Sequence, residues 1–313
     1  MFVTIATVTS MFSDERNIML LSWLDMGCFA ALAMVLLSLL RPLPRLALLS
    51  AMVFFALALL SARVSVVWLA LVPLAIYLRY QLGREPRWWH HAILIMLVVG
   101  LAAHLWPGFI NLQLLEQVKA GPQSAPFDLY MNLDKPVAAL VLLYVVQGCR
   151  TWQGHGTVFA ADSRWSPALQ ATPRWVLLLG VQIICCAVVM LLAWLSGYVI
   201  PEPKLPSWWW LFLVNNLLFT CIAEEAFFRG YLMNQLQRVM PAIGALLLSS
   251  VLFGLAHSAG GPHYVLLASV AGMGYGLLFV YGRHLMWPIV GHALLNLLHL
   301  LLFTYPYWQF GRL

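Results

Sequence analysis

The last third of the 313-residue sequence holds two adjacent carboxylates and an arginine inside a continuous apolar segment, 208–236. Charges in an apolar environment are costly unless they are paired or serve a function. Glu225 and Arg229 are four residues apart, so they share one face of a helix and can form an ion pair. Glu224 points about 100° away from Glu225 and has no partner in its own helix. We therefore expect Glu224 to face other helices.

Two further apolar segments carry polar side chains that can meet Glu224. His257 ends one of them and follows Phe253 by one helical turn. His292 and Asn296 are four residues apart in the last segment and share a face. At a rise of about 1.5 Å per residue, the depths of these side chains in their helices allow them to converge with Glu224.

A cluster of this composition suits hydrolysis. A glutamate and a histidine can hold a water molecule between them and remove its proton. A second histidine and an asparagine amide can donate hydrogen bonds to the oxyanion that forms when water attacks a carbonyl group. One glutamate and two histidines, here Glu224, His257 and His292, are also a zinc ligand set with a fourth position open for water. The sequence has no His-Glu-x-x-His helix, and the residue types leave both chemistries open.

The elements that must position these residues are membrane-spanning helices. Hydrophobic residues make up 63% of the sequence and charged residues 9%, whereas a soluble domain has about 25% charged residues. Since a span takes roughly 20 apolar residues, we predict an all-α, polytopic transmembrane helical bundle of about 8–10 spans with a four-helix catalytic core in the C-terminal third. The best count gives spans near 18–40, 45–62, 64–80, 88–107, 136–152, 174–200, 208–236, 241–257, 262–281 and 285–304.

The net charge of +6 does not indicate nucleic-acid binding, because lysines and arginines are scattered singly through short loops. Basic residues are more frequent in cytoplasmic loops. With the N-terminus outside, ten of the 17 lie on the inner side and six on the outer side, and Arg229 lies in a span. This topology puts the polar loop 108–135 outside and 150–173 inside. We expect a multi-pass protein of a bacterial plasma membrane with its site towards the cytoplasmic half.

Three short motifs together carry a family resemblance. Glu-Glu-x-x-x-Arg at 224–229, Phe-x-x-x-His at 253–257 and His-x-x-x-Asn at 292–296 occur in this order on apolar segments. The set resembles the CPBP (Abi) family of intramembrane peptidases, which includes the CAAX prenyl endopeptidases. The resemblance covers about 208–304, and the first 200 residues are recognisable only as membrane helices.

The resemblance implies an endopeptidase that cuts a peptide bond in a membrane-associated substrate tail. By position, Glu224 and His257 would activate the water, while His292 and Asn296 would form the oxyanion site. The implied partners are a peptide or lipidated peptide and the lipid bilayer, with no nucleic acid. The substrate tail would approach the site from the cytoplasm or from within the membrane.

Three residues of the same motifs would support this site: Glu225, Arg229 and Phe253. The family has been described as metalloproteases, but its architecture also fits a glutamate mechanism without a metal. We prefer the mechanism without a cofactor. The alternative is a divalent metal such as zinc, which would be held by Glu224, His257 and His292.

We divide the chain into N-terminal transmembrane helices (1–207, with loops 108–135 and 150–173), a catalytic core (208–304) and a short tail (305–313). The competing hypothesis is a non-enzymatic membrane protein on the same fold, either a binding protein of the bacteriocin-immunity type or a transporter. Transporters often contain internal repeats, and the two halves of this sequence show none. The complete set of motifs also disfavours an inactive relative.

Polar residues near these motifs are interpreted as structural. Loop 108–135 is polar enough to be a re-entrant or interfacial segment that caps the site, yet Asp134 and Lys135 at its end fit a simple helix cap. His299 lies one heptad after His292, and we interpret it as a core histidine rather than a cavity residue.

Overall fold

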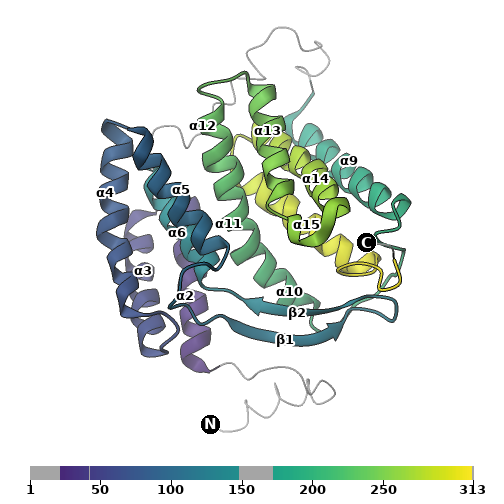
Figure 1. Ribbon diagram of the computed structural model, residues 1–313, viewed down its shortest axis with the longest axis horizontal. Helices are drawn as coiled ribbons and strands as arrows, with labels where there is room; N and C mark the ends of the chain where they lie inside the picture. The colour runs from purple at the N-terminus through teal and green to yellow at the C-terminus, as the bar shows by residue number, and fades with distance from the viewer. Residues whose placement is uncertain (1–21, 42, 148–171, 312–313) are drawn as a thin grey trace.

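The computed structural model describes residues 22–41, 43–147 and 172–311, which form a bundle of helices with one β-hairpin at its end (Figure 1). The N-terminal helices are α2 (Trp23–Leu40), α3 (Pro44–Leu60), the 3-10 helix η1 (Val66–Ala70), α4 (Leu71–Arg84), α5 (Trp88–Ala102) and α6 (Asp134–Gln147). The C-terminal helices are α9 (Arg174–Leu195), α10 (Trp209–Asn215), η3 (Asn216–Cys221), α11 (Ile222–Glu225), η4 (Ala226–Met233), α12 (Asn234–Leu236), α13 (Ala242–Leu255), the 3-10 helix η5 (Ser258–Gly260), α14 (Gly261–Gly282) and α15 (Met286–Leu302).

Each of the ten predicted spans coincides with a helical segment of the described residues, which confirms the polytopic helical bundle. Five helical stretches in the described part of the chain are long and apolar enough to cross a membrane. They are Trp23–Leu40, Val66–Arg84, Arg174–Leu195, Trp209–Leu236 and Ser258–Gly282. The apolar helices α3, α5, α13 and α15 have 10–17 residues. They are therefore shorter than the roughly 20 residues that span a hydrocarbon core.

The helix ends follow local chemistry. Ser22 caps α2, because its hydroxyl oxygen accepts a hydrogen bond from the backbone N–H of Asp25 at 3.1 Å. Pro44 opens α3, a position where a proline leaves no helical hydrogen bond unmade. After α14, Arg283 adopts a left-handed conformation with φ of 54° and ends the helix.

The loop predicted at 108–135 contains a β-hairpin that the sequence pattern did not reveal. Strand β1 (Leu112–Lys119) pairs antiparallel with β2 (Pro126–Met131), and two irregularities in register interrupt the ladder. Figure 1 shows both strands lying across the lower end of the C-terminal helices, beneath α10 and α15. The hairpin is an addition to the all-α bundle, and it leads directly into α6.

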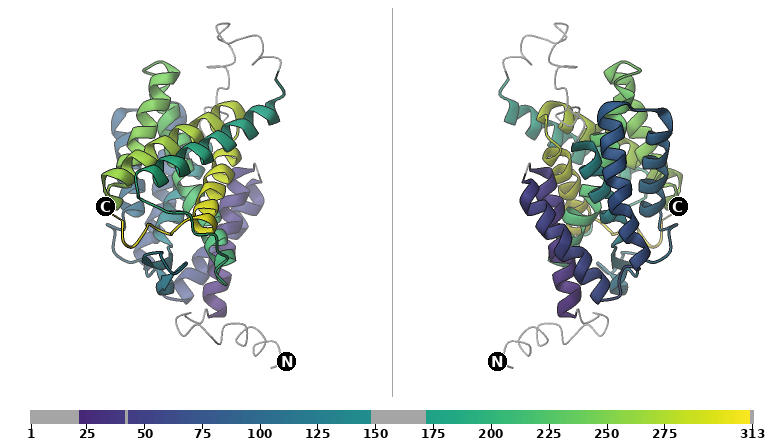
Figure 2. Two further views of the ribbon diagram at one scale, coloured as in Figure 1. Left: turned by 90° about the vertical axis from the view of Figure 1, so that its right-hand side faces the viewer. Right: turned by 90° about the vertical axis from the view of Figure 1, so that its left-hand side faces the viewer.

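A central helix joins the two groups of helices. The stretch from α10 to α12 lies between α2–α6 on one side and α13–α15 on the other (Figure 1), with α6 packed against α11, η3 and η4. On the far side, α9 runs alongside α14 (Figure 2). The central helix therefore contacts both halves of the molecule.

Within this central helix, two π-helical stretches, η3 and η4, flank the single α-helical turn α11. π-helical turns are uncommon and occur often at functional sites, because the wider turn changes the direction of side chains. The α-helical turn that carries Glu224 and Glu225 thus has a wider, π-helical stretch on each side.

The segment predicted as a short tail, 305–313, is packed against the hairpin as far as it is described. The backbone N–H of Ala125 donates to the carbonyl of Tyr307 at 3.1 Å, and that of Gln309 donates to Gln123 at 3.1 Å. Most of the predicted loop 150–173 lies outside the described residues.

Candidate active site

The ion pair predicted between Glu225 and Arg229 is present and completely buried. Arg229 Nη1 donates to Glu225 Oε1 at 3.0 Å, and both side chains are 0% exposed. Arg229 Nη2 donates to the carbonyl of Gly272 at 2.8 Å, and a Cβ at Gly272 would lie 3.1 Å from that nitrogen. The guanidinium also lies 4.6 Å from the centre of the Phe253 ring, a cation–π distance.

Glu224 faces away from this pair, as predicted, and its partner comes from the N-terminal half. Lys135 Nζ lies 2.5 Å from Glu224 Oε1. The two residues belong to α6 and α11, which pack against each other. Each of the two adjacent carboxylates therefore has its own cation, with Lys135 beside Glu224 and Arg229 beside Glu225.

The two predicted histidines meet at the other oxygen of Glu224. His257 Nε2 lies 3.7 Å from Glu224 Oε2, and His292 Nε2 lies 3.8 Å from the same atom. These separations are too long for direct hydrogen bonds. Glu224 Oε2 is buried and has no hydrogen-bond partner among the described residues.

The far nitrogens of both imidazoles are fixed by hydrogen bonds. His257 Nδ1 lies 2.7 Å from the carbonyl oxygen of Phe253, which can only accept, so Nδ1 carries the proton. His292 Nδ1 donates to Glu225 Oε1 at 3.0 Å. A neutral imidazole in this arrangement turns the lone pair of Nε2 towards Glu224, and an imidazolium turns an N–H there.

Aromatic rings fix the orientation of His292 from both sides. The Tyr275 ring stacks on it with centroids 4.4 Å apart and 17° between the planes. The Phe253 ring meets it edge-on at 5.6 Å. Phe253 thus contacts Arg229, His257 and His292 together, and its supporting role stays a prediction.

A small pocket of about 50 Å³ adjoins these side chains, enough for a few water molecules. His257, His292 and Asn296 line it, together with apolar residues of α9 and α14. Asn296 Nδ2 donates one hydrogen to Asn216 Oδ1 at 3.1 Å and keeps a second N–H.

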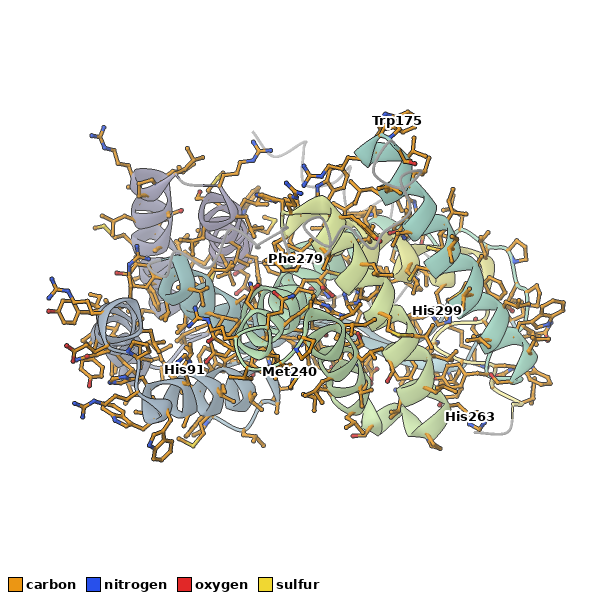
Figure 3. All side chains as sticks on the ribbon, turned by 90° about the horizontal axis from the view of Figure 1, so that it is seen from above. His91, Trp175, Met240, His263, Phe279 and His299 are labelled. Carbon is orange, nitrogen blue, oxygen red and sulfur yellow. The ribbon has the colours of Figure 1, made fainter. Side chains whose placement is uncertain are left out.

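His299 also lines this pocket, so its interpretation as a core histidine was incomplete. Its Nε2 donates to the carbonyl of Thr304 at 3.0 Å. Seen from above in Figure 3, His299 lies among the C-terminal helices, whereas Trp175 and His263 lie at the periphery.

Glu224, His257 and His292 have the ligand atoms that zinc prefers, but these atoms lie farther apart than a tetrahedral zinc site requires. Ligand bonds of about 2.0–2.1 Å at a tetrahedral angle separate two ligand atoms by roughly 3.3 Å, whereas Glu224 Oε2 lies 3.7 and 3.8 Å from the two Nε2 atoms. The ammonium of Lys135 also occupies the other carboxylate oxygen. Among the described residues, no group of three or more histidine, cysteine, aspartate or glutamate side chains is arranged to hold a metal ion.

Two residues of the cluster lie at the hairpin end of the bundle. Lys135 is the second residue of α6, directly after the hairpin, and His257 follows the last turn of α13 at the same end. Glu224 and His292 lie deeper, near the middle of the central helix and of α15. The predicted outer position of this loop and the predicted cytoplasmic position of the site both stay predictions.

Sequence reasoning missed Lys135, Tyr275 and Asn216. Lys135 had a signal, since it is a lysine at the entry to an apolar helix, but that position also fits a cap. Tyr275 lies among the glycines of α14, a pattern that indicates close packing without naming the partner. Asn216 is a lone amide in the central helix, and only the packed structure shows that it meets Asn296.

Comparison with protein families finds one match. Residues 206–298 match the family described as type II CAAX prenyl endopeptidase Rce1-like. This segment is similar to Rce1-like domains. The match contains all three motifs and confirms the resemblance seen in the sequence. No curated protein and no solved structure matches the chain.

The Rce1-like match and the apolar helices agree with each other, because both indicate a membrane protein. The matched family is one of CAAX-type intramembrane proteases, and the chain is a multi-pass integral membrane protein. The matched residues begin just before α10 and end within α15. Lys135 lies outside them.

Proposed function

We propose that this protein is an intramembrane endopeptidase that hydrolyses a peptide bond in a prenylated, CAAX-type tail of a membrane-associated substrate. The observation that carries the proposal is the arrangement around Glu224. One carboxylate oxygen is held by Lys135, and the other faces the Nε2 atoms of His257 and His292 beside a small pocket.

The proposed reaction begins with a water molecule between Glu224 Oε2 and His257 Nε2. The 3.7 Å between these atoms is too long for a direct hydrogen bond, and the pocket beside His257 has room for water. As the water oxygen attacks the carbonyl carbon, its proton passes to the carboxylate of Glu224. When the tetrahedral intermediate collapses, the C–N bond breaks and the same proton passes to the leaving amine.

His292 and Asn296 are proposed to stabilise the oxyanion. Asn296 has a second N–H available beside the pocket. Donation from His292 requires a proton on Nε2, and Glu225 lies where it balances the charge of such an imidazolium. Preorganised donors of this kind typically contribute about 10²–10³-fold each to the rate.

We propose that the reaction uses no metal. Two observations support this choice: the ion pair between Lys135 and Glu224, and ligand spacings wider than a tetrahedral site requires. In the alternative, zinc would be held by Glu224, His257 and His292 and would lower the pKa of its bound water.

Cleavage by purified protein tests the proposal. The substrate is a quenched fluorescent peptide ending in farnesyl-cysteine, two aliphatic residues and one further residue, compared with the same peptide without the farnesyl group. Glu224→Gln is expected to lower kcat by about 10²–10⁴-fold. Glu116→Gln, at an exposed site on the hairpin, is the matched control and is expected to keep wild-type activity.

Each result of this experiment decides a separate point. Cleavage that is equal in wild type and Glu224→Gln would reject the glutamate mechanism. No cleavage of either peptide by folded wild type would favour the non-enzymatic alternatives, a bacteriocin-immunity-type protein or a transporter. Loss of activity with a chelator and its recovery with zinc would replace the metal-free mechanism. Equal cleavage of both peptides would reject prenyl recognition.

We further propose that the hairpin and the site face the cytoplasm. This orientation follows from the proposed substrate, a tail presented on that side, and it reverses the topology inferred from basic residues. Gln117→Cys on the hairpin, with the five native cysteines replaced by serine, is expected to react with a membrane-impermeant maleimide in inside-out vesicles but not in intact cells. Labelling in intact cells would restore the topology inferred from the basic residues.

A further inference from the structure

Among the residues that the structure describes, Lys135 is the cation that lies beside Glu224 from outside the Rce1-like match. Its Nζ lies 2.5 Å from Glu224 Oε1, and the two residues are 89 positions apart in the sequence. The Lys135 side chain is 21% exposed and that of Glu224 is 10% exposed. An ion pair as sheltered as this one is weakly screened by solvent.

The backbone that carries Lys135 is held firmly in place. Asp134 Oδ1 accepts a hydrogen bond from the backbone N–H of Lys135 at 2.9 Å, and Asn111 Oδ1 accepts one from Leu133 at 2.9 Å. Asp134 Oδ2 also lies 2.5 Å from His104 Nδ1. The hairpin and the end of α5 therefore fix the start of α6, and the lysine reaches Glu224 from a rigid position.

The contact determines how Glu224 presents itself. With Oε1 held by the ammonium, Oε2 is the oxygen that faces His257 and His292. A carboxylate that acts as a general base must be held in a productive geometry, and its charge needs compensation in a low-dielectric site. His257 and His292 compensate it only when they are protonated, whereas Lys135 brings an ammonium group directly to Oε1.

We infer that Lys135 is a positioning residue for the proposed peptidase reaction: it aims the Glu224 carboxylate at the two histidines and balances its charge. This inference rests on the proposed function. It also gives the N-terminal half a part in the chemistry, because α6 lies outside the matched residues 206–298.

The charged and titratable groups around Glu224 come from several elements. Lys135 faces it from α6, His257 from the end of α13 and His292 from α15. On its own helix, Glu225 is already paired with Arg229, and Cys221 is buried. Removing the lysine therefore removes the ammonium group that contacts Glu224, so we expect the acid limb of the pH–rate profile to move to higher pH.

The experiment compares Lys135→Met, Lys135→Arg and Lys119→Met in the full-length protein with the farnesylated peptide. Lys135→Met is expected to lower kcat by tenfold to a hundredfold, less than the loss of a general base, which costs about 10²–10⁴-fold. KM is expected to change little, because Lys135 does not line the pocket. Lys135→Arg keeps the charge and is expected to recover most of the activity.

Lys119→Met is the matched control, because Lys119 ends β1 and donates to Gln309 far from Glu224. A Lys135→Met protein with the kcat and the acid limb of Lys119→Met would overturn the inference. If Lys135→Met does not fold, Lys135→Gln is measured by the same criteria. The proposed function fails separately, when wild type itself does not cleave or when Glu224→Gln keeps full activity.

Discussion

Buried carboxylates in the N-terminal and C-terminal helices differ in how they are hydrogen-bonded. In the N-terminal half, Asp25 of α2 accepts two hydrogen bonds from Arg63, at 2.8 and 3.1 Å, and both carboxylate oxygens are used. In the C-terminal half, Glu225, Arg229 and His292 form a connected network that leads to Glu224, whose Oε2 has no hydrogen-bond partner in the described chain.

This difference separates a structural ion pair from a candidate catalytic one. A closed pair lowers the cost of its own charges and offers nothing to a ligand. A network that leaves one oxygen free next to a pocket can act on a bound molecule. Lys135 connects the two halves, since it belongs to the N-terminal helices and completes the C-terminal network.

The largest expected effect on stability concerns the buried pair in the C-terminal half. Arg229→Met leaves Glu225 buried without its cation, and such a change costs about 3–5 kcal/mol. Unfolding by denaturant in mixed micelles measures it. The double variant Glu225→Gln/Arg229→Met is expected to recover much of the loss, because no uncompensated charge remains. A single variant as stable as wild type would show that the pair does not support the fold.

The corresponding change in the N-terminal half is expected to be smaller and to leave catalysis intact. Arg63→Met removes the hydrogen bonds to Asp25 and is expected to cost about 1.5–3 kcal/mol in the same unfolding assay. The kcat for the farnesylated peptide is expected to stay at the wild-type value. Arg45→Met, at an exposed site in α3, is the control. A loss of kcat in a folded Arg63→Met protein would remove the distinction between the two halves.

The smallest effect concerns Glu202, in the loop where the C-terminal half meets the hairpin. Burial acts to raise the pKa of Glu202, but hydrogen bonds from Ser124, the Gln123 backbone and Lys204 outweigh it and hold the pKa below the ordinary value of 4.5. A carboxyl whose pKa is lower in the folded state stabilises the fold above its unfolded pKa. This contribution is lost as the pH falls through the folded pKa.

We therefore expect Glu202→Gln to be less stable than wild type near neutral pH, with a difference that shrinks as the pH drops below about 4.5. Thermal unfolding in detergent at pH 7, 5 and 3.5 measures it. Ser124→Ala, which removes one donor at 2.6 Å, is expected to show part of the same effect. A difference that grows towards acid pH would reverse the assigned sign.

Much of the fold could be predicted because its cause is local. Apolar runs of suitable length, interrupted by prolines, glycines and arginines, define the helices, and all ten predicted spans contain one. The hairpin could not be predicted, because its irregular ladder lacks the strict alternation that marks a strand. The orientation stays a prediction, since a modest excess of basic residues depends on which loops share a side.

In the candidate site, too, local features could be predicted from the sequence and long-range contacts could not. Helical spacing alone determined that Glu225 pairs with Arg229 and that Glu224 turns to other helices, because four residues make about one turn. The order of the three motifs determined the family. Only the tertiary structure decided which cation meets Glu224 and which carboxylate holds His292, because these pairs are 89 and 67 residues apart. Contacts at such separations depend on how helices pack, and no local pattern in the sequence records them.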